Sequence, residues 1–146
     1  MTPEVGSSFS PTKNYPSFST QINQVTTVTT EETAGAVTFT AAEILGGLIL
    51  RDPAGAGRAD LFPTAASLCQ AIEGGYGYGA GQSIRVVIRN TADANETITM
   101  TANTGVTISG TATIGQNNSK EFLIVFDDVT PGSEAYTAYS LGTATF

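Results

Sequence analysis

The residues of this chain that most suggest a chemical role lie between Leu48 and Ile72, in the stretch LILRDPAGAGRADLFPTAASLCQAI. An apolar run is followed by a glycine-rich loop that carries two arginines and two aspartates, and then by a helical pattern. A strand, a glycine loop and a helix in succession also form the arrangement that holds nucleotide phosphates. The stretch therefore has the order of elements that a phosphate-binding site would need.

The spacing within this loop argues against a bound phosphate. A dinucleotide loop needs glycine at its first, third and sixth positions; Gly55 and Gly57 fit, but Asp60 occupies the sixth. Its carboxylate would lie where the phosphate has to bind. No Gly-Lys-Ser/Thr motif follows, and no further alternation of strands and helices supplies a parallel sheet. We interpret the loop as a corner of the fold or an interface, whose four charged residues pair among themselves or with a neighbouring subunit: Arg51, Asp52, Arg58 and Asp60.

Two tyrosines lie in a loop that is otherwise almost entirely glycine. Tyr76 and Tyr78 belong to residues 74–81, GGYGYGAG. Aromatic rings on a loop tip can stack on a sugar ring or enter a pocket of a partner protein. The chain has no tryptophan, which argues against a sugar-binding platform. We interpret Tyr76 and Tyr78 as subunit-interface or loop contacts, with glycan binding as the alternative.

The remaining acidic clusters have spacings that suit turns. Asp93, Asn95 and Glu96 offer oxygen atoms of the kind that calcium binds, but no EF-hand pattern surrounds them. Asp127 and Asp128 are adjacent, and neighbours on a strand point to opposite faces, so a converging carboxylate pair is not expected. We interpret both clusters as turns and expect no metal ion and no catalytic residue.

The composition removes several classes of active site. The chain of 146 residues has no histidine and a single cysteine, Cys69. A histidine-based triad, a histidine–zinc site, an internal disulfide and a thiolate cluster all need residues that the sequence lacks. Thirteen carboxylates against six basic residues give a formal net charge of −7, which repels phosphate backbones and anionic lipids. We expect no enzymatic activity, no cofactor, no nucleic-acid partner and no membrane partner.

Residues 1–36 differ in composition from the rest of the chain. They lack the basic and apolar regions of a secretory signal peptide, and Pro3, Pro11 and Pro16 break any helix. Polar residues dominate. We interpret this segment as an extended arm that becomes ordered only against a partner, with a disordered tail as the alternative. The residues that would bind the partner are the apolar ones that recur singly: Phe9, Tyr15, Phe18, Ile22 and Val25.

Residues 37–146 have the pattern of one globular domain. Thr40–Glu43 fits a capping box that begins one short helical turn, and Gly46 is placed to end it before a short buried strand. One clear helix is expected over residues 64–73, between Pro63 and Gly74. The apolar face of this helix has helical spacing and consists of Ala65, Leu68, Cys69 and Ile72.

The rest of the domain reads as strands. Apolar and polar residues alternate over residues 84–89, 97–101 and 106–109, while residues 122–126, FLIVF, are apolar on both faces as in a central strand. Turn signals separate these runs at short intervals. We predict a mainly β fold: an antiparallel, jelly-roll-like β-sandwich with one short α-helix and an extended N-terminal arm.

The succession RDPAGAGRADLFPTAASL, IRVVIRNT, ETITMTANTGVTISG and YSLGTATF resembles small β-sandwich virion proteins of tailed bacteriophages, cyanophages included. The resemblance covers residues 37–146 and contains no catalytic motif. Such proteins decorate or cement the icosahedral head as trimers over the capsid lattice, and related domains occur in head fibres and spikes.

The resemblance implies a capsid decoration protein on the outer surface of the virion, assembled in the host cytoplasm. It would act as a homotrimer, with the major capsid protein as its partner. Two rivals stay open. One is a head-fibre or spike domain that binds a host surface glycan through loop tips such as Tyr76 and Tyr78. The other is an enzyme that uses carboxylates alone, such as a glycosidase.

Overall fold

The structure, a computed structural model, describes residues 27–73 and 79–146. Two helices and nine strands are assigned within these residues, in the chain order β1 (Thr27–Glu31), α3 (Ala41–Gly46), β2 (Gly47–Arg51), β3 (Arg58–Leu61), α4 (Ala65–Glu73), β4 (Ser83–Asn90), β5 (Ile98–Thr101), β6 (Val106–Ser109), β7 (Thr113–Ile114), β8 (Asn118–Asp128) and β9 (Ala135–Thr145).

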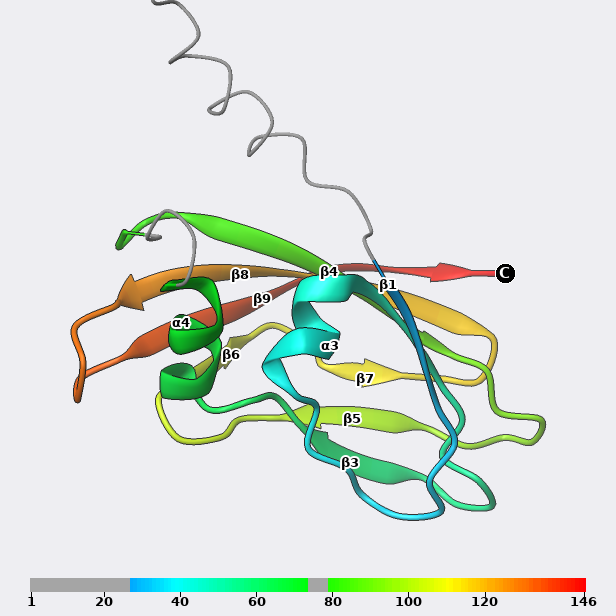
Figure 1. The fold of residues 1–146 in the computed structure, drawn as a ribbon. Helices are drawn as coiled ribbons and strands as arrows, with labels where there is room; N and C mark the ends of the chain where they lie inside the picture. Colours follow the sequence, from blue (N-terminus) through cyan, green and yellow to red (C-terminus); the bar gives the residue numbers. More distant parts are fainter. Residues whose placement is uncertain (1–26, 74–78) are drawn as a thin grey trace, which may run out of the picture.

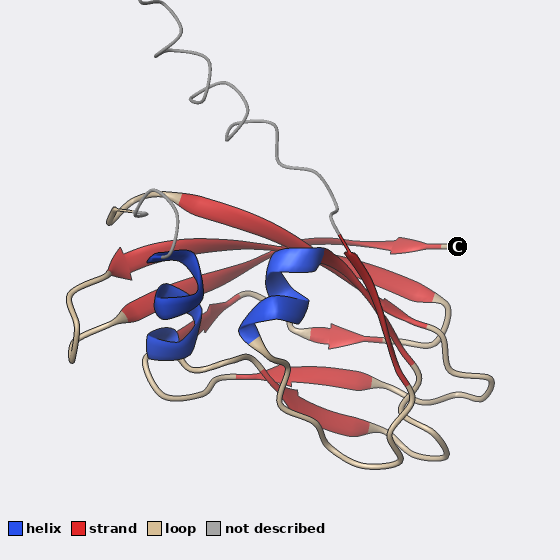
Figure 2. Cartoon of the chain, in the orientation of Figure 1, coloured by secondary structure: helices blue, strands red, loops and turns tan. Residues whose placement is uncertain are grey.

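The strands form two sheets. The larger has six strands in the order β1-β2-β4-β8-β9-β6, and the smaller has three in the order β3-β5-β7. Figure 1 shows that the smaller sheet and both helices lie on the same side of the larger sheet, and Figure 2 shows how far strands dominate. The prediction of a mainly β chain is confirmed.

The prediction of purely antiparallel pairing is wrong. Strands β4, β8 and β9 pair antiparallel, as do β5 and β7. By contrast β1–β2, β2–β4, β6–β9 and β3–β5 are parallel pairs. Alternating side chains mark a strand but not its direction. Direction is set here by connections that leave the sheet, through α3 after β1 and through β3 and α4 after β2, and return the chain to the same end.

The prediction of one helix is also corrected, because the short turn before β2 is a full α-helix. The Thr40 hydroxyl accepts a hydrogen bond from the Glu43 backbone N–H at 3.3 Å, and Glu43 Oε2 accepts one from the Thr40 N–H at 2.7 Å. Gly47 ends the helix with φ 92°, in the left-handed region that glycine adopts without strain. The predicted helix over residues 64–73 is observed as α4.

The predicted domain boundary before residue 37 is displaced. Residues 27–31 form β1, paired with β2 from Thr27 opposite Gly47 to Glu31 opposite Arg51. Backbone pairing with β2 supplies the contacts that this threonine-rich segment cannot obtain by packing on itself. A Cβ added at Gly46 would lie 2.9 Å from the Thr27 carbonyl oxygen, so the close approach of β1 requires a glycine there. Residues 27–36 therefore belong to the folded body.

The core fills the space between the two sheets. The Phe62 ring stands edge-on to Phe122 at a centroid distance of 5.3 Å and to Tyr136 at 6.5 Å. The Tyr136 hydroxyl donates to the Pro63 carbonyl oxygen at 2.7 Å, and burial raises the pKa of this tyrosine. An aromatic centre with its one polar atom paired fixes α4 and the smaller sheet against β8 and β9.

Lys120 is a buried cation on the inward side of β8. Its side chain is 4% exposed, and its ammonium group donates to the Thr111 carbonyl oxygen at 2.7 Å. The Ser140 hydroxyl donates to the same oxygen, also at 2.7 Å. Burial lowers the pKa of Lys120 from its usual value of 10.5, because removal from water disfavours the charged form.

We expect Lys120→Met to be at least as stable as the parent at pH 7. The variant keeps most of the side-chain volume and removes the desolvation cost, while Ser140 still satisfies the Thr111 carbonyl oxygen. The unfolded parent holds the Lys120 proton up to about pH 10.5, but the folded parent releases it at lower pH. The stability of the parent relative to the variant should therefore rise with pH within that window.

Urea denaturation of both proteins from pH 7 to 10.5 measures this difference. Arg85→Met, a matched change at an exposed position of β4, should show no such rise with pH. A Lys120→Met variant that is clearly less stable than the parent at pH 7 would mean that the ammonium–carbonyl contact outweighs the desolvation cost.

Candidate functional site

The loop that suggested a phosphate site contains a buried ion pair. Arg51 Nε lies 2.8 Å from Asp60 Oδ2, and neither side chain has any exposed surface. Arg51 Nη2 donates to Asp60 Oδ1 at 3.3 Å and to the Gly35 carbonyl oxygen at 2.6 Å. Arg51 Nη1 donates to the carbonyl oxygens of Thr33 and Asp52 at 2.9 and 2.7 Å. All five N–H groups of the guanidinium therefore have partners within the chain.

The other two charged residues close the glycine loop. Asp52 Oδ1 accepts from the Ala54 backbone N–H at 2.9 Å, and Arg58 Nε donates to the Pro53 carbonyl oxygen at 3.1 Å. Ala54 and Gly55 have φ values of 52° and 93°, which is the tight left-handed turn that these hydrogen bonds hold.

Arg51 and Asp60 thus pair with each other, which is one of the two alternatives that the sequence left open. The other alternative, a contact of their side chains with a neighbouring subunit, is wrong for these two residues because neither reaches the surface. The same burial leaves the Arg51 guanidinium no free donor for a phosphate. The charged residues of this loop therefore have a structural role.

The carboxylates of the two acidic clusters do not converge on one point. Asp93 and Asn95 are exposed, whereas Glu96 is buried. Asp127 Oδ2 accepts from the Thr137 hydroxyl at 2.7 Å, and Asp128 Oδ1 accepts from the Thr130 N–H at 2.8 Å. The backbone hydrogen bond from Thr130 holds the pKa of Asp128 below its usual value. No group of three or more metal-binding side chains occurs within residues 27–73 and 79–146.

Tyr76 and Tyr78 lie outside the described residues, as do the apolar residues proposed for the arm: Phe9, Tyr15, Phe18, Ile22 and Val25. None of the described helices is long and apolar enough to cross a bilayer.

The feature that sequence reasoning missed is the side of the six-stranded sheet that no described strand or helix covers (Figure 1). We call it the outer face. It follows from strand alternation, because its side chains lie between the buried ones that face the core. They are Val28, Thr30, Leu48, Leu50, Ser83, Arg85, Val87, Arg89, Thr107, Ser119, Glu121, Leu123, Val125, Asp127, Thr137, Tyr139, Leu141 and Ala144.

Strand register places these side chains in rows. Val28 is opposite Leu48, Leu48 is opposite Val87, and Val87 is opposite Glu121. A second row runs from Arg85 to Leu123 and on to Tyr139. Side chains opposite one another on neighbouring strands lie within contact distance. The outer face is therefore one continuous surface on which apolar side chains of neighbouring strands alternate with polar ones.

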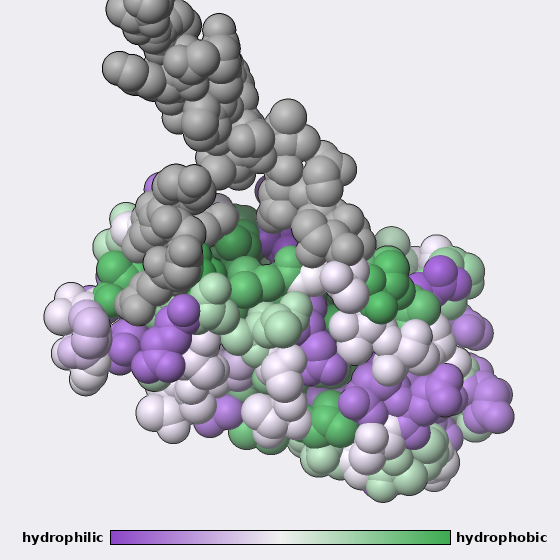
Figure 3. Space-filling model, in the orientation of Figure 1, coloured by the Kyte–Doolittle hydropathy of each residue, from purple (hydrophilic) through white to green (hydrophobic). Residues whose placement is uncertain are grey.

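Several large apolar side chains are exposed on this surface. The large apolar side chains that the described part of the chain exposes are Val28 at 52%, Tyr139 at 40%, Leu141 at 47% and Phe146 at 47%. Three lie on the outer face, and the Phe146 ring stacks 3.3 Å from the Arg89 guanidinium carbon on the same face. Figure 3 shows green apolar patches on the upper part of the molecule beside the grey atoms, in the orientation of Figure 1.

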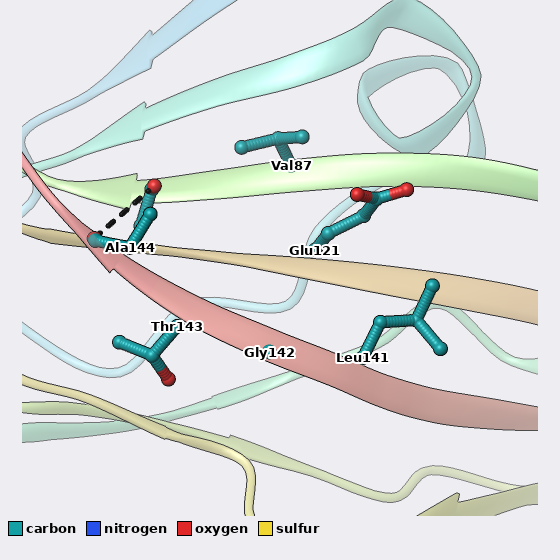
Figure 4. A pocket seen from close by; sticks show the side chains of 7 residues that line it. Val87, Glu121, Leu141, Gly142, Thr143 and Ala144 are labelled. Atoms are coloured by element: carbon teal, nitrogen blue, oxygen red, sulfur yellow. Dashed lines mark hydrogen bonds between the residues drawn. The ribbon is translucent and has the colours of Figure 1, made fainter.

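A shallow hollow of about 320 Å³ lies on the outer face. Figure 4 shows Val87, Glu121 and Leu141 around it, on three neighbouring strands. The pairing of β8 with β9 shifts register between Glu121 and Phe122, which leaves Leu141 without a residue opposite it. This β-bulge turns Leu141 outward beside Gly142. The hollow is open and contains one carboxylate, so it suits an inserted side chain better than a reaction.

The charges of the outer face balance one another. Arg85 forms an ion pair with Glu121, and Asp127 is bonded to Thr137. The Arg89 guanidinium is covered by the Phe146 ring, and its buried Nε has no hydrogen-bond partner. Two arginines and two carboxylates give this face no net charge, although the whole chain carries −7. A neutral apolar surface suits contact with another protein.

The sequence did contain one signal for this face. Residues 122–126 of β8 are apolar on both sides, which is typical of a strand covered on both faces. In the structure the inner side chains Phe122, Ile124 and Phe126 are buried, but Leu123 and Val125 face outward and are only partly covered. The strand is central, but the described chain covers one of its faces.

No family model, no curated protein and no solved structure matches this chain.

We expect Asp60→Ala to lower the free energy of unfolding by about 3–5 kcal/mol, because it leaves the buried Arg51 guanidinium without its counter-ion. Chemical denaturation followed by circular dichroism measures the loss. Asp93→Ala, the same change at an exposed turn, is the matched control and should cost less than about 0.5 kcal/mol. Equal losses at the two positions would contradict the structural role of the ion pair.

Proposed function

We propose that this protein is a non-catalytic structural component of a tailed-bacteriophage head, a decoration or cement protein that binds the lattice of the major capsid protein and stabilises the shell. The observation that supports the proposal is the outer face. A broad, neutral, apolar surface with only a shallow hollow suits the covering of another protein surface rather than the binding of a small molecule.

The resemblance of residues 37–146 to phage virion proteins suggests the major capsid protein as the partner and the outer surface of the virion as the location. On this proposal the two sheets form a jelly-roll-like β-sandwich that sits on the outer surface of the capsid as a homotrimer. A body of two sheets that needs no cofactor can remain folded on an exposed virion surface. Repetition over the capsid lattice would turn modest affinities into avidity.

The proposal assigns residues 1–26 to an extended arm that lies along the major capsid protein. The described core is complete without them, since its buried apolar side chains all lie between Phe39 and Ala138. Contacts of this arm would come from the five apolar residues Phe9, Tyr15, Phe18, Ile22 and Val25. Such a segment adds contact area when it binds, at a cost in ordering entropy.

Binding to phage heads that lack this protein tests the function. We expect the full chain to bind these heads saturably and to raise the temperature at which they release DNA. A variant in which the five apolar arm residues are serine should fold but lose most of its binding, because the arm loses its apolar contact area. Co-sedimentation measures binding, and circular dichroism checks the fold.

The matched control changes five polar residues of the same segment to alanine: Thr2, Ser8, Ser10, Ser17 and Thr20. This control should bind as the parent does. A parent chain that does not bind heads would overturn the proposed function. A serine variant that saturates heads like the parent would leave the function standing and remove the arm assignment. Specific binding of the parent to surface glycans would favour the spike-domain alternative instead.

A further inference from the structure

The outer face has the composition of a surface that is normally covered. In β8, Leu123 and Val125 face outward between the buried residues Phe122, Ile124 and Phe126. A strand with apolar residues on both sides is typical of a sheet that is packed on both of its faces. Only the inner face is packed within residues 27–73 and 79–146, so a second layer remains to be supplied.

The size of the face matches a standard protein interface. Six strands in a row span about 24 Å at a spacing of about 4.8 Å, and an eleven-residue strand extends about 36 Å. With the shorter outer strands, the face offers on the order of 600–800 Å², close to the roughly 800 Å² that each partner contributes to a stable interface.

Charge restricts what can cover this face. Copies of a chain with a net charge of −7 repel one another unless they meet through surfaces that carry no net charge. The outer face meets this requirement in its sum, because Arg85 is paired with Glu121, and Arg89 and Asp127, which lie at opposite ends of the face, carry opposite charges. A basic or acidic partner would find no complementary charge here, whereas an identical neutral face fits.

We propose that the outer face is the contact between copies of this chain, so that the six-stranded sheets of neighbouring copies pack face to face. Aligned sheets pack about 10 Å apart with their apolar side chains interdigitated. Leu141, which the β-bulge turns outward, would enter the hollow beside Val87 of the neighbouring copy. This inference deepens the proposed function by naming the partner of the face, but it does not require the capsid to hold. A face that packs on the same face of a second copy makes a twofold contact, so a dimer takes the place of the homotrimer proposed above, and binding to the capsid is left to residues 1–26.

The test uses the full chain and two double variants. Tyr139→Arg with Leu141→Arg places two charges on the outer face at two neighbouring apolar positions of β9, which are 40% and 47% exposed. Ala59→Arg with Ala94→Arg adds the same charges at exposed positions outside the outer face. Sedimentation equilibrium measures the mass of each protein, and thermal unfolding by circular dichroism shows that each is folded.

We expect the parent and the Ala59/Ala94 variant to have a mass of at least two chains of 15.0 kDa, and the Tyr139/Leu141 variant to fall to the mass of one chain. Thiol labelling of Leu141→Cys gives a second measurement, because Cys69 is buried. Labelling should be slow at high protein concentration and should speed up on dilution as copies separate.

A monomeric parent, or a Tyr139/Leu141 variant that keeps the mass of the parent, would overturn the inference. So would a Leu141→Cys variant whose protection from labelling does not change on dilution, because that would place a segment of the same chain over the face. A parent that binds heads as a monomer would overturn this inference alone. A parent that assembles but does not bind heads would overturn the proposed function alone.

Discussion

The buried ion pair of Arg51 and Asp60 lies where the two sheets meet. A guanidinium cannot lose its proton in a protein, so a buried arginine must pair every N–H group or cost several kcal/mol. Arg51 does so by binding Asp60 together with the carbonyl oxygens of Thr33, Gly35 and Asp52. Asp60 in turn accepts from the Val37 N–H at 3.0 Å. One side chain thereby joins β2 of the larger sheet to β3 of the smaller sheet and fixes the chain that leaves β1.

This inner arrangement determines what the other side of the sheet presents. Successive side chains of a strand point to opposite faces. Because Ile49 and Arg51 are turned inward, Leu48 and Leu50 must point outward, and the same parity sends Val87, Leu123 and Val125 to the outer face. The apolar side chains of the outer face therefore follow from the alternation of whole strands and do not depend on any one loop. They are carried by β1, β2, β4, β8 and β9 of the larger sheet, and a slip of one residue that hid these side chains would expose the core and separate Arg51 from Asp60.

Local signals in the sequence predicted local structure well. The capping box of Thr40 and Glu43 predicted where the first helix begins. The helical spacing of apolar residues from Ala65 to Ile72 predicted the second. Both signals depend only on residues that are close in sequence. Strand direction, the membership of β1 in the larger sheet and the burial of Arg51 could not be predicted in the same way. Each depends on partners far away along the chain, such as the 18 residues that separate Arg51 from Thr33. The outer face could have been suspected from β8 alone, but alternation does not reveal which face the rest of the chain covers.

The distribution of charge links the fold to assembly. Of the thirteen carboxylates, Glu121 and Asp127 lie on the outer face, and both have partners there. The excess negative charge therefore lies on the remaining surface, where it opposes contact between copies in any other orientation. This repulsion weakens as salt screens it beyond about 8–10 Å, while contact through apolar side chains does not depend on it. On the proposed contact, two copies meet through faces that carry no net charge, so the contact adds no like-charge repulsion and needs no ion pair between the copies.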